Sequence, residues 1–271
     1  MKISALVLTY NNANILERCL SSLDFTNEIV TIDSYSRDGT QAICNKFNTV
    51  FIQNEYINYT KQIEFGISKC KNDIIIIIDS DEEVKDKLKN EIKNSLLNFE
   101  IEKFSGFYIP RKVFFLNKYI QHGKWYPDYQ FRIFNKHKIK IEHREIHSSV
   151  HPLFESLKLQ NDLIHYTYEN IFDYVERLNK YTSLEVTNFI ESNRNFKKRK
   201  LLLNPLSEFL RMFFVNKGYK DGMAGFTLAS LSSVYKFLSY LKYWEYLMSK
   251  KSNTELPPIK NKDFKFKFNK V

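Results

Sequence analysis

The sequence predicts an α/β fold with a mostly parallel sheet, helices on both of its faces, a small antiparallel β extension and a helical C-terminal region. Two observations support this fold class. Hydrophobic strands and amphipathic helices alternate through the first hundred residues, as they do in parallel sheets with right-handed crossovers. Residues 72–83 then read NDIIIIIDSDEE, and the isoleucine run, too short to span a membrane, indicates a central strand buried on both faces.

The elements of the first half follow from hydrophobic periodicity. The predicted strands are ISALVL at 3–8, EIVTID at 28–33, TVFIQ at 49–53 and the isoleucine run at 74–78. The predicted helices cover residues 15–23, 41–47, 59–71 and 84–98. Asp38-Gly39 marks a tight turn after the second strand.

The pattern changes after residue 100. Residues 106–152 are rich in aromatic and β-branched side chains, which predicts antiparallel strands packed on the parallel part. Periodic apolar residues predict a helix over 171–191, and residues 223–248 predict another apolar and aromatic helix. The tail at 261–271 alternates lysine with phenylalanine and is expected to form an edge strand or a basic arm.

The composition restricts the function only broadly. The net charge of +10 points to a polyanionic partner, which is a nucleic acid, an anionic membrane surface or a phosphorylated substrate. The cysteines at 19, 44 and 70 form no C-x-x-C pair, so we expect small core residues in a reducing compartment. The N-terminus has the pattern of a strand and not of a signal peptide, which predicts a cytoplasmic location.

Acidic residues follow the isoleucine strand directly, as DSDEE at 79–83. Asp79 and Asp81 alternate along an extended chain, so both can face one spot. A Mg²⁺ or Mn²⁺ ion that bridges to a diphosphate is the usual reason for such a pair. The alternative is that Asp81 and Glu82 cap a helix that begins near Val84.

Polar residues also follow the first two strands. Asp33 ends the second strand, and Tyr10 and Asn11 follow the first. The carboxyl ends of parallel strands meet at one edge, where open α/β sheets bind their ligands. The chain has no glycine-rich dinucleotide motif and no P-loop, so a metal and side chains would have to hold the phosphates of a bound nucleotide.

The aromatic and histidine residues of the middle region add further candidates. Trp125 and Tyr126 stand beside Pro127-Asp128 in a predicted loop and are either core residues or an apolar platform for a sugar ring. All histidines of the chain lie between residues 122 and 165. One of them is therefore a candidate ligand for the expected metal.

The sequence resembles the inverting glycosyltransferases of family 2, which have the Rossmann-like GT-A fold. The general family is indicated by TYN at 9–11, IDSYSRDGT at 32–40 and DSDE at 79–82. Within the family, the chain is similar to bacterial lipopolysaccharide core β-1,4-glucosyltransferases that use UDP-glucose. This similarity rests on GFYIPRKVFF, GKWYPDYQFRIF and the late GYKDGMAGF, and the resemblance spans roughly residues 1–250.

The resemblance implies roles for individual residues. Asp33 would contact the uracil, in a donor pocket that also contains Thr9, Tyr10, Asn11 and Ser80. Asp79 and Asp81 would meet the ribose and the metal, and His147 would be a third metal ligand. The relatives often have His-Glu where this chain has His147-Ser148, so any role of that glutamate is absent or taken by Glu145.

The acceptor side follows from the same resemblance. Asp128 falls where the family places its catalytic base, and Trp125 and Tyr126 would contact the sugar or the acceptor. Lys69 and Arg132 would neutralise phosphate or orient that loop. The implied domains are a GT-A catalytic domain at 1–168, with a nucleotide-sugar half at 1–100 and an acceptor half at 101–168, and a helical region with a basic tail at 169–271.

The expected activity is metal-assisted transfer of a hexose, glucose by the resemblance, from a UDP-sugar to a lipopolysaccharide core or another lipid-linked saccharide. Capsule or protein glycosylation, a silent sugar-nucleotide binder and a basic nucleic-acid-binding protein are the alternatives. The acidic strand end disfavours nucleic acid, because it repels phosphate unless a metal intervenes.

The C-terminal region suggests how the chain meets its surroundings. Basic residues at 197–200 adjoin an apolar run, which is typical of a segment at an anionic membrane interface and also of a solvated charge run beside a core helix. The helix at 223–248 is expected to be interfacial or to form a homodimer. We therefore expect a peripheral protein at the inner face of the cytoplasmic membrane.

Overall fold

The computed structural model describes residues 1–100, 102–142, 149–168 and 170–252. The chain forms two compact units. Within the described residues, the first comprises Met1–Lys112 and Asp128–His165, and the second comprises Val113–Pro127 and residues 166–252. Each unit has its own core, so each is described by itself.

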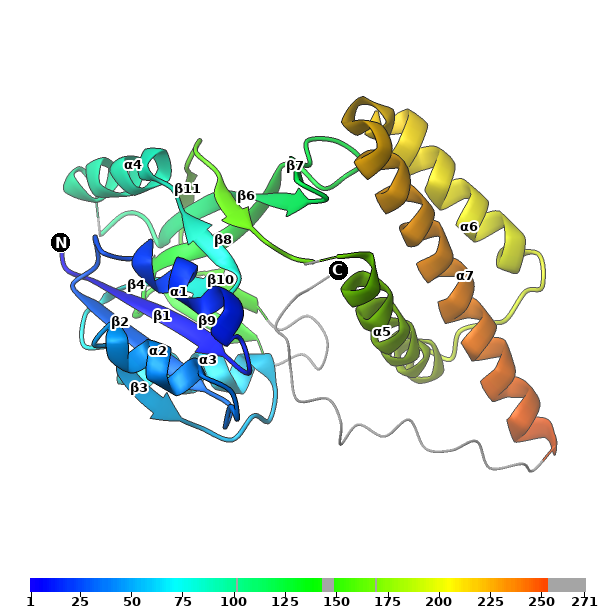
Figure 1. Cartoon of the computed structure of the whole chain (residues 1–271), viewed down its shortest axis with the longest axis horizontal. Helices are drawn as coiled ribbons and strands as arrows, with labels where there is room; N and C mark the ends of the chain where they lie inside the picture. Colours follow the sequence, from blue (N-terminus) through cyan, green and yellow to red (C-terminus); the bar gives the residue numbers. More distant parts are fainter. Residues whose placement is uncertain (101, 143–148, 169, 253–271) are drawn as a thin grey trace. The chain divides into compact units, whose positions relative to one another are not determined.

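The first unit is built on a mixed sheet (Figure 1). Its parallel part has the order β3 (Val50–Gln53), β2 (Glu28–Asp33), β1 (Ile3–Thr9) and β4 (Ile74–Asp79). All three pairings between these neighbours are parallel. The predicted parallel strands are confirmed. The isoleucine strand β4 is the last of these four and lies at the centre of the whole mixed sheet instead of its parallel part.

The antiparallel strands continue the same sheet beyond β4. The order proceeds through β8 (Asp128–Asn135), β6 (Gly106–Phe115), β12 (Leu163–His165) and β5 (Glu82–Val84). β8 pairs antiparallel with both β4 and β6. The second edge of β4 would otherwise leave backbone donors and acceptors unpaired in the interior, so β8 completes the hydrogen bonding of the central strand.

Short strands complete the sheet. β7 (Lys118–Tyr119) and β11 (Ser156–Lys158) pair with β6. β9 (Ile139–Glu142) and β10 (Ser149–Pro152) form a separate antiparallel pair. The expected α/β architecture with a small antiparallel extension is therefore confirmed.

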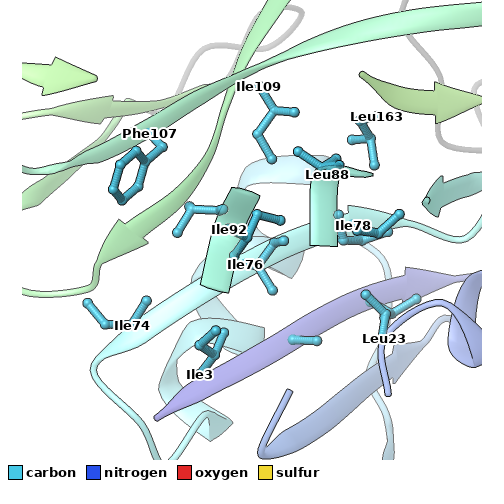
Figure 2. Close-up of a cluster of buried hydrophobic side chains, with 14 of the residues drawn as sticks. Ile3, Leu23, Ile74, Ile76, Ile78, Leu88, Ile92, Phe107, Ile109 and Leu163 are labelled. Atoms are coloured by element: carbon cyan, nitrogen blue, oxygen red, sulfur yellow. The ribbon is translucent and has the colours of Figure 1, made fainter. Parts of the chain in front are cut away.

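The two faces of β4 explain why the isoleucine run is uninterrupted. Ile76 and Ile78 pack against Leu88 and Ile92 of α4 (Asp86–Leu97), as Figure 2 shows. That face also carries α1 (Ala13–Ser21) and α2 (Thr40–Lys46). Ile75 and Ile77 point the other way, toward α3 (Tyr59–Lys69) and the β9–β10 pair. Every side chain of the run is consequently buried.

The cysteines are part of these cores. Cys19, Cys44 and Cys70 are buried and free of disulfides, which confirms the expectation of small core residues.

The second unit is helical. It contains α5 (Ile171–Glu191), α6 (Lys200–Leu210), a π-helical turn η1 (Arg211–Val215), a 3₁₀ turn η2 (Gly218–Asp221) and α7 (Gly222–Ser252). Tyr174 and Leu178 of α5 pack with Leu228 of α7 and with Phe115. The predicted helices at 171–191 and 223–248 are confirmed. None of the helices within the described residues has the length and apolarity needed to cross a bilayer.

The GYKDGMAGF segment is a packing motif of this unit. A Cβ on Gly225 would lie 1.9 Å from the carbonyl oxygen of Gly218, so the backbones touch there. Asp221 is buried, and its Oδ2 accepts hydrogen bonds from the backbone N–H groups of Gln121 and His122 at 3.0 and 2.8 Å. The motif thus fixes the loop that precedes Trp125.

Replacing Ile76 with Ala is expected to lower the free energy of unfolding by about 2–5 kcal/mol, because the side chain is fully buried at the centre of the sheet. Leu97→Ala, at a residue of α4 that is 77% exposed, is the matched control and should change it by less than about 0.5 kcal/mol. Urea unfolding followed by circular dichroism measures both. Equal effects would contradict the assignment of β4 as the core strand.

Candidate active site

The carboxyl ends of the parallel strands bring the predicted polar residues to one edge. The register pairs Thr9 with Asp33 and Leu8 with Asp79, so the ends of β1, β2 and β4 lie next to each other. The strands alternate with helices along the chain, so the turns that follow these three strands also meet there.

Hydrogen bonds tie the turn after β1 to the turn after β2. The backbone N–H of Asn11 donates to Ser36 Oγ at 2.8 Å, and Asn11 Oδ1 accepts from the backbone N–H of Arg37 at 2.8 Å. Asn11 adopts a positive φ of 49°, which lets its amide face the second turn. Asn12 Nδ2 donates to Ser80 Oγ at 2.5 Å and so joins the turn after β4. Three loops thus form one frame.

Asp33 lies at the floor of this frame and is fully buried. Its Oδ2 accepts from the backbone N–H of Ser36 at 2.8 Å and from Gln53 Nε2 at 3.3 Å, and the hydroxyl of Ser36 donates to Oδ1. The Thr9 hydroxyl is buried beside it and has no hydrogen-bond partner among the described residues. Tyr10 is half-buried. A nucleoside placed here would meet one carboxylate and a hydroxyl.

A buried arginine organises the end of β4. Arg132 Nη2 donates to Asp79 Oδ2 at 2.6 Å and to Glu82 Oε1 at 2.7 Å. Glu82 Oε2 in turn accepts from the backbone N–H of Asp79 at 2.9 Å. Tyr59 Oη approaches Asp79 Oδ1 at 3.4 Å. Two carboxylates are therefore held together in the interior by a shared cation.

The pKa values reflect this arrangement. Burial alone would raise the pKa of the Asp79 carboxyl, but the charge and hydrogen bond of Arg132 outweigh burial and lower it. For Glu82, burial dominates over the attraction of Arg132 and raises the pKa. Burial would lower the pKa of Arg132, but Asp79 and Glu82 raise it well above its usual value. Arg132 is consequently a permanent cation of the site.

A second arginine extends the network to Asp128, the first residue of β8. Arg111 Nη1 lies 3.7 Å from Glu82 Oε1, while Arg111 Nε and Nη2 donate to Asp128 Oδ2 at 2.9 and 2.6 Å. Gln130 Nε2 donates to the other oxygen of Asp128 at 2.6 Å. The side chain of Asp128 is 35% exposed, whereas those of Asp79 and Glu82 are 7% and 0% exposed. Asp128 is thus the most exposed carboxylate of the network.

Asp81 points to a different partner. Its Oδ2 lies 3.5 Å from His165 Nε2, and both side chains are buried. No group of three potential metal ligands occurs within the described part of the chain. The alternative role of Asp81 and Glu82 as helix caps is wrong, because α4 begins at Asp86 and Glu82 belongs to β5. His147 lies outside the described residues, as does Glu145.

One of the predicted residues, Lys69, is not brought to this edge. Lys69 is exposed and ends α3, about 15 Å along the helix axis from Tyr59, whose hydroxyl faces Asp79. Trp125 and Tyr126 belong to the second unit, where Trp125 packs against the core that includes Phe115. Lys69 is therefore left out of the proposal below.

Sequence reasoning missed several residues of the network. It did not single out Arg111, Gln130, Tyr59 and His165, and it treated Glu82 only as a possible cap or as part of the DSDE motif. One signal was available for Gln130, because Asp128, Gln130 and Arg132 alternate along one strand and so share a face. The role of Arg111 could not be predicted in this way, because it follows from the pairing of β6 with β8, which places Arg111 opposite Asp128.

The comparisons with known proteins agree with this geometry. The model of the family described as "Glycosyl transferase family 2" matches residues 4–154. An uncharacterised glycosyltransferase of Rickettsia felis is 24% identical over 93% of this chain and 92% of its own length. The lipopolysaccharide core biosynthesis glycosyltransferase LpsC of Rhizobium meliloti is 25% identical over 90% of this chain and 93% of its own.

A solved structure supports the fold. The mannosyltransferase PcManGT of Pyrobaculum calidifontis superposes with a TM-score of 0.53 at 12% identity, over 90% of this chain and 87% of that chain. This similarity confirms the predicted GT-A architecture.

Replacing Arg132 with Met should lower the free energy of unfolding by about 3–5 kcal/mol, because two carboxylates would stay buried without their cation. Burial would then raise the pKa of both, and the folded chain would bind protons that the unfolded chain does not. The loss of unfolding free energy relative to the wild type should therefore become smaller as the pH is lowered from about 8 to about 5. Urea unfolding at each pH measures this.

Arg37→Met is the control for this variant, because residue 37 is exposed. It should stay within about 0.5 kcal/mol of the wild type at every pH. An Arg132→Met protein as stable as this control would rule out the buried cation as an organiser of the site.

Proposed function

Because the chain belongs to glycosyl transferase family 2, we propose that it transfers a hexose, glucose by its resemblance, from a UDP-sugar to a saccharide acceptor with inversion. The observation that carries this proposal is the placement of Asp128. Its carboxylate is held by Arg111 and Gln130 and is partly exposed, in the same network as the carboxylate that ends β4. The network thus connects Asp128, the proposed base for the acceptor, with Asp79 at the proposed donor pocket.

The reaction assigns a task to Asp128. An acceptor hydroxyl oxygen forms a bond to the anomeric carbon while the bond from that carbon to the diphosphate oxygen breaks. The electron pair of the broken bond leaves with UDP, and the hydroxyl proton passes to the Asp128 carboxylate. Arg111 and Gln130 orient the carboxylate by donating to both of its oxygens. One displacement of this kind inverts the anomeric centre.

The loop frame is the proposed donor pocket. Asp33 would accept a hydrogen bond from the uracil, and the Asn11 amide would donate one to it. Thr9 and Tyr10 would lie beside them. Asp79, whose carboxylate is held by Arg132, would meet the ribose at its rim. Ser80, which Asn12 binds, keeps the third loop in register with the other two. The PcManGT structure was solved with GDP-Man and Mn²⁺, which supports a nucleotide-sugar donor in general.

Asp81 is the proposed ligand of a Mg²⁺ or Mn²⁺ ion. Such ions usually take one or two protein carboxylates and complete their shell with water and phosphate oxygens, so a single buried carboxylate beside the His165 imidazole fits. Asp79 could add an oxygen only from a carboxylate whose Oδ2 binds Arg132 and whose Oδ1 is approached by the Tyr59 hydroxyl, and His147 remains a proposal from the family resemblance. A bound ion would neutralise charge on the leaving diphosphate.

The acceptor is proposed from the relatives. The similarity to LpsC, named for lipopolysaccharide core biosynthesis, supports a lipopolysaccharide core or another lipid-linked saccharide. We place the protein, as a peripheral enzyme, at the inner face of the cytoplasmic membrane. Trp125, Tyr126 and the cation Arg132 stay proposed for the acceptor side. A capsule or protein glycan is the second candidate class of acceptor, and nucleic acid is not proposed as a partner.

Calorimetry should detect binding of UDP-glucose that depends on Mn²⁺ and weakens at least about tenfold in Asp81→Asn, because the variant loses its charged metal ligand. UDP-galactose and GDP-mannose test the donor preference. Asp86→Asn, whose side chain is 94% exposed, should bind like the wild type. Binding of GDP-mannose in preference to both UDP-sugars would overturn the UDP assignment. No binding of any donor would overturn the proposed function.

Asp128→Asn should lower the rate of UDP release about 10²- to 10⁴-fold, because the amide cannot take the acceptor proton. The affinity for the donor should stay unchanged, since Asp128 is not in the loop frame. Coupled detection of UDP, with truncated lipooligosaccharide as acceptor and with Asp86→Asn as control, measures the rate. An Asp128→Asn protein with wild-type turnover would contradict the role of base, and a wild type that binds donor without turnover would be a silent binder.

A further inference from the structure

α6 exposes its apolar side, which amphipathic helices of globular proteins normally bury. No residue of this helix is buried, although leucines make up much of it. Leu202, Leu203, Leu206 and Leu210 share one side of the helix and are 75%, 55%, 56% and 44% exposed. Helices of globular proteins normally turn such a stripe toward the core. The apolar side of α6 therefore faces outward.

The other side of α6, followed by Arg211 of η1, faces α5 and α7, and Leu201 on it packs against the cluster that includes Phe189 and Tyr240. Asn204, Ser207, Glu208 and Arg211 line a cavity together with residues of α5 and α7. α6 and α7 run alongside each other and pack closely (Figure 1). Ser233 Oγ of α7 donates to the carbonyl oxygen of Pro205 at 2.9 Å, and Phe226 stacks edge-on against Phe209. The helix is thus anchored by α7 while Leu202, Leu203, Leu206 and Leu210 remain exposed.

The uncovered surface continues past the helix end. Phe214 and Val215 of η1 are 55% and 72% exposed, and Met223 at the start of α7 is 75% exposed. Val234 and Phe237, farther along α7, are also exposed. We call the six side chains Leu202, Leu203, Leu206, Leu210, Phe214 and Val215 the apolar ridge. Large contiguous apolar surfaces of this kind mark interaction sites.

Basic residues flank both ends of the apolar ridge. Lys197, Lys198 and Arg199 are exposed just before α6, and Lys217 and Lys220 are exposed just after η1. The acidic residues of the same segment do not offset them, because Glu208 pairs with Arg211 and Asp221 is buried against residues 121 and 122. The surface is therefore apolar along its length and cationic at its ends.

We propose that the apolar ridge docks into the interface of an anionic lipid bilayer, with the flanking lysines and Arg199 on the headgroups. The leucines would lie at the acyl boundary and the cations at the level of the phosphates, as in interfacial helices. A second copy of this chain fits less well, because docking two ridges would bring their cationic ends together. This inference does not depend on the proposed reaction, since it concerns binding to lipid alone.

Flotation of the full chain with vesicles tests the proposal. Binding to phosphatidylcholine vesicles with about 30% phosphatidylglycerol should exceed binding to pure phosphatidylcholine at least about tenfold and should weaken with salt. Lys197→Gln/Lys198→Gln/Arg199→Gln should weaken it about 100-fold, since each cation contributes about fivefold. Lys87→Gln/Lys93→Gln/Lys103→Gln, at exposed residues of the first unit, removes the same charge and should change it less than about threefold.

The apolar contribution is tested separately. Leu203→Glu/Leu206→Glu should weaken binding by about 100-fold or more, because two leucines would no longer enter the interface. Ile57→Glu/Leu97→Glu, at residues that are 73% and 77% exposed in the first unit, is the matched control and should bind like the wild type. All four substituted residues are exposed, so the variants are expected to fold. Unchanged melting temperatures and unchanged donor affinity check that they do.

Several outcomes would overturn the proposal. One is equal binding to neutral and anionic vesicles, and another is equal loss in the ridge variant and its control. A third is a dimer in sedimentation velocity that Leu203→Glu/Leu206→Glu dissociates, while the wild type binds no vesicles. This last result would assign the apolar ridge to a second copy of the chain.

Discussion

The buried cation Arg132 is the constraint on which the site depends. Asp79 ends the central strand and Glu82 begins the next one, so the chain brings two carboxylates into the interior within four residues. Neither would stay ionised there alone, because burial favours the neutral form. The guanidinium of Arg132 contacts both and allows the turn between β4 and β5 to close around Asp81. The position of Asp81, the proposed metal ligand, thus depends on the ion pairs that Arg132 makes with Asp79 and Glu82.

The same network connects the two halves of the first unit. Arg132 lies on β8, which pairs antiparallel with β4 and completes its hydrogen bonding. β6 pairs with β8 in turn and carries Arg111 opposite Asp128. The order Asp79, Arg132, Glu82, Arg111, Asp128 alternates in charge from a fully buried end to a partly exposed one. Such alternation compensates the desolvation of each group and leaves the outermost carboxylate, Asp128, the most exposed.

The helical unit is stabilised differently from the sheet. Its core is built from α5, α7 and the strand end near Phe115, and α6 is held on α7 without burying its own leucines. An apolar surface of this extent costs solvation free energy in water unless a partner covers it. The cationic residues at both ends of the apolar ridge match an anionic bilayer. This would place a lipid-linked acceptor and the enzyme at one surface.

The sequence by itself predicted the parallel sheet, because a run of isoleucines too short to span a membrane favours a strand buried on both faces. It also predicted that Asp33 and Asp79 end strands of the same sheet. It also predicted the helices at 171–191 and 223–248 from their periodicity. The tertiary structure alone decided the partners of the acids. Arg111 and Arg132 are far from Asp79 and Glu82 in the chain. The antiparallel pairing of β8 with β4 and β6 brings Arg132 within hydrogen-bonding distance of both acids and Arg111 within 3.7 Å of Glu82. The outward side of α6 was likewise undecided, because periodicity reveals that a helix has an apolar face but not which neighbour, if any, covers it.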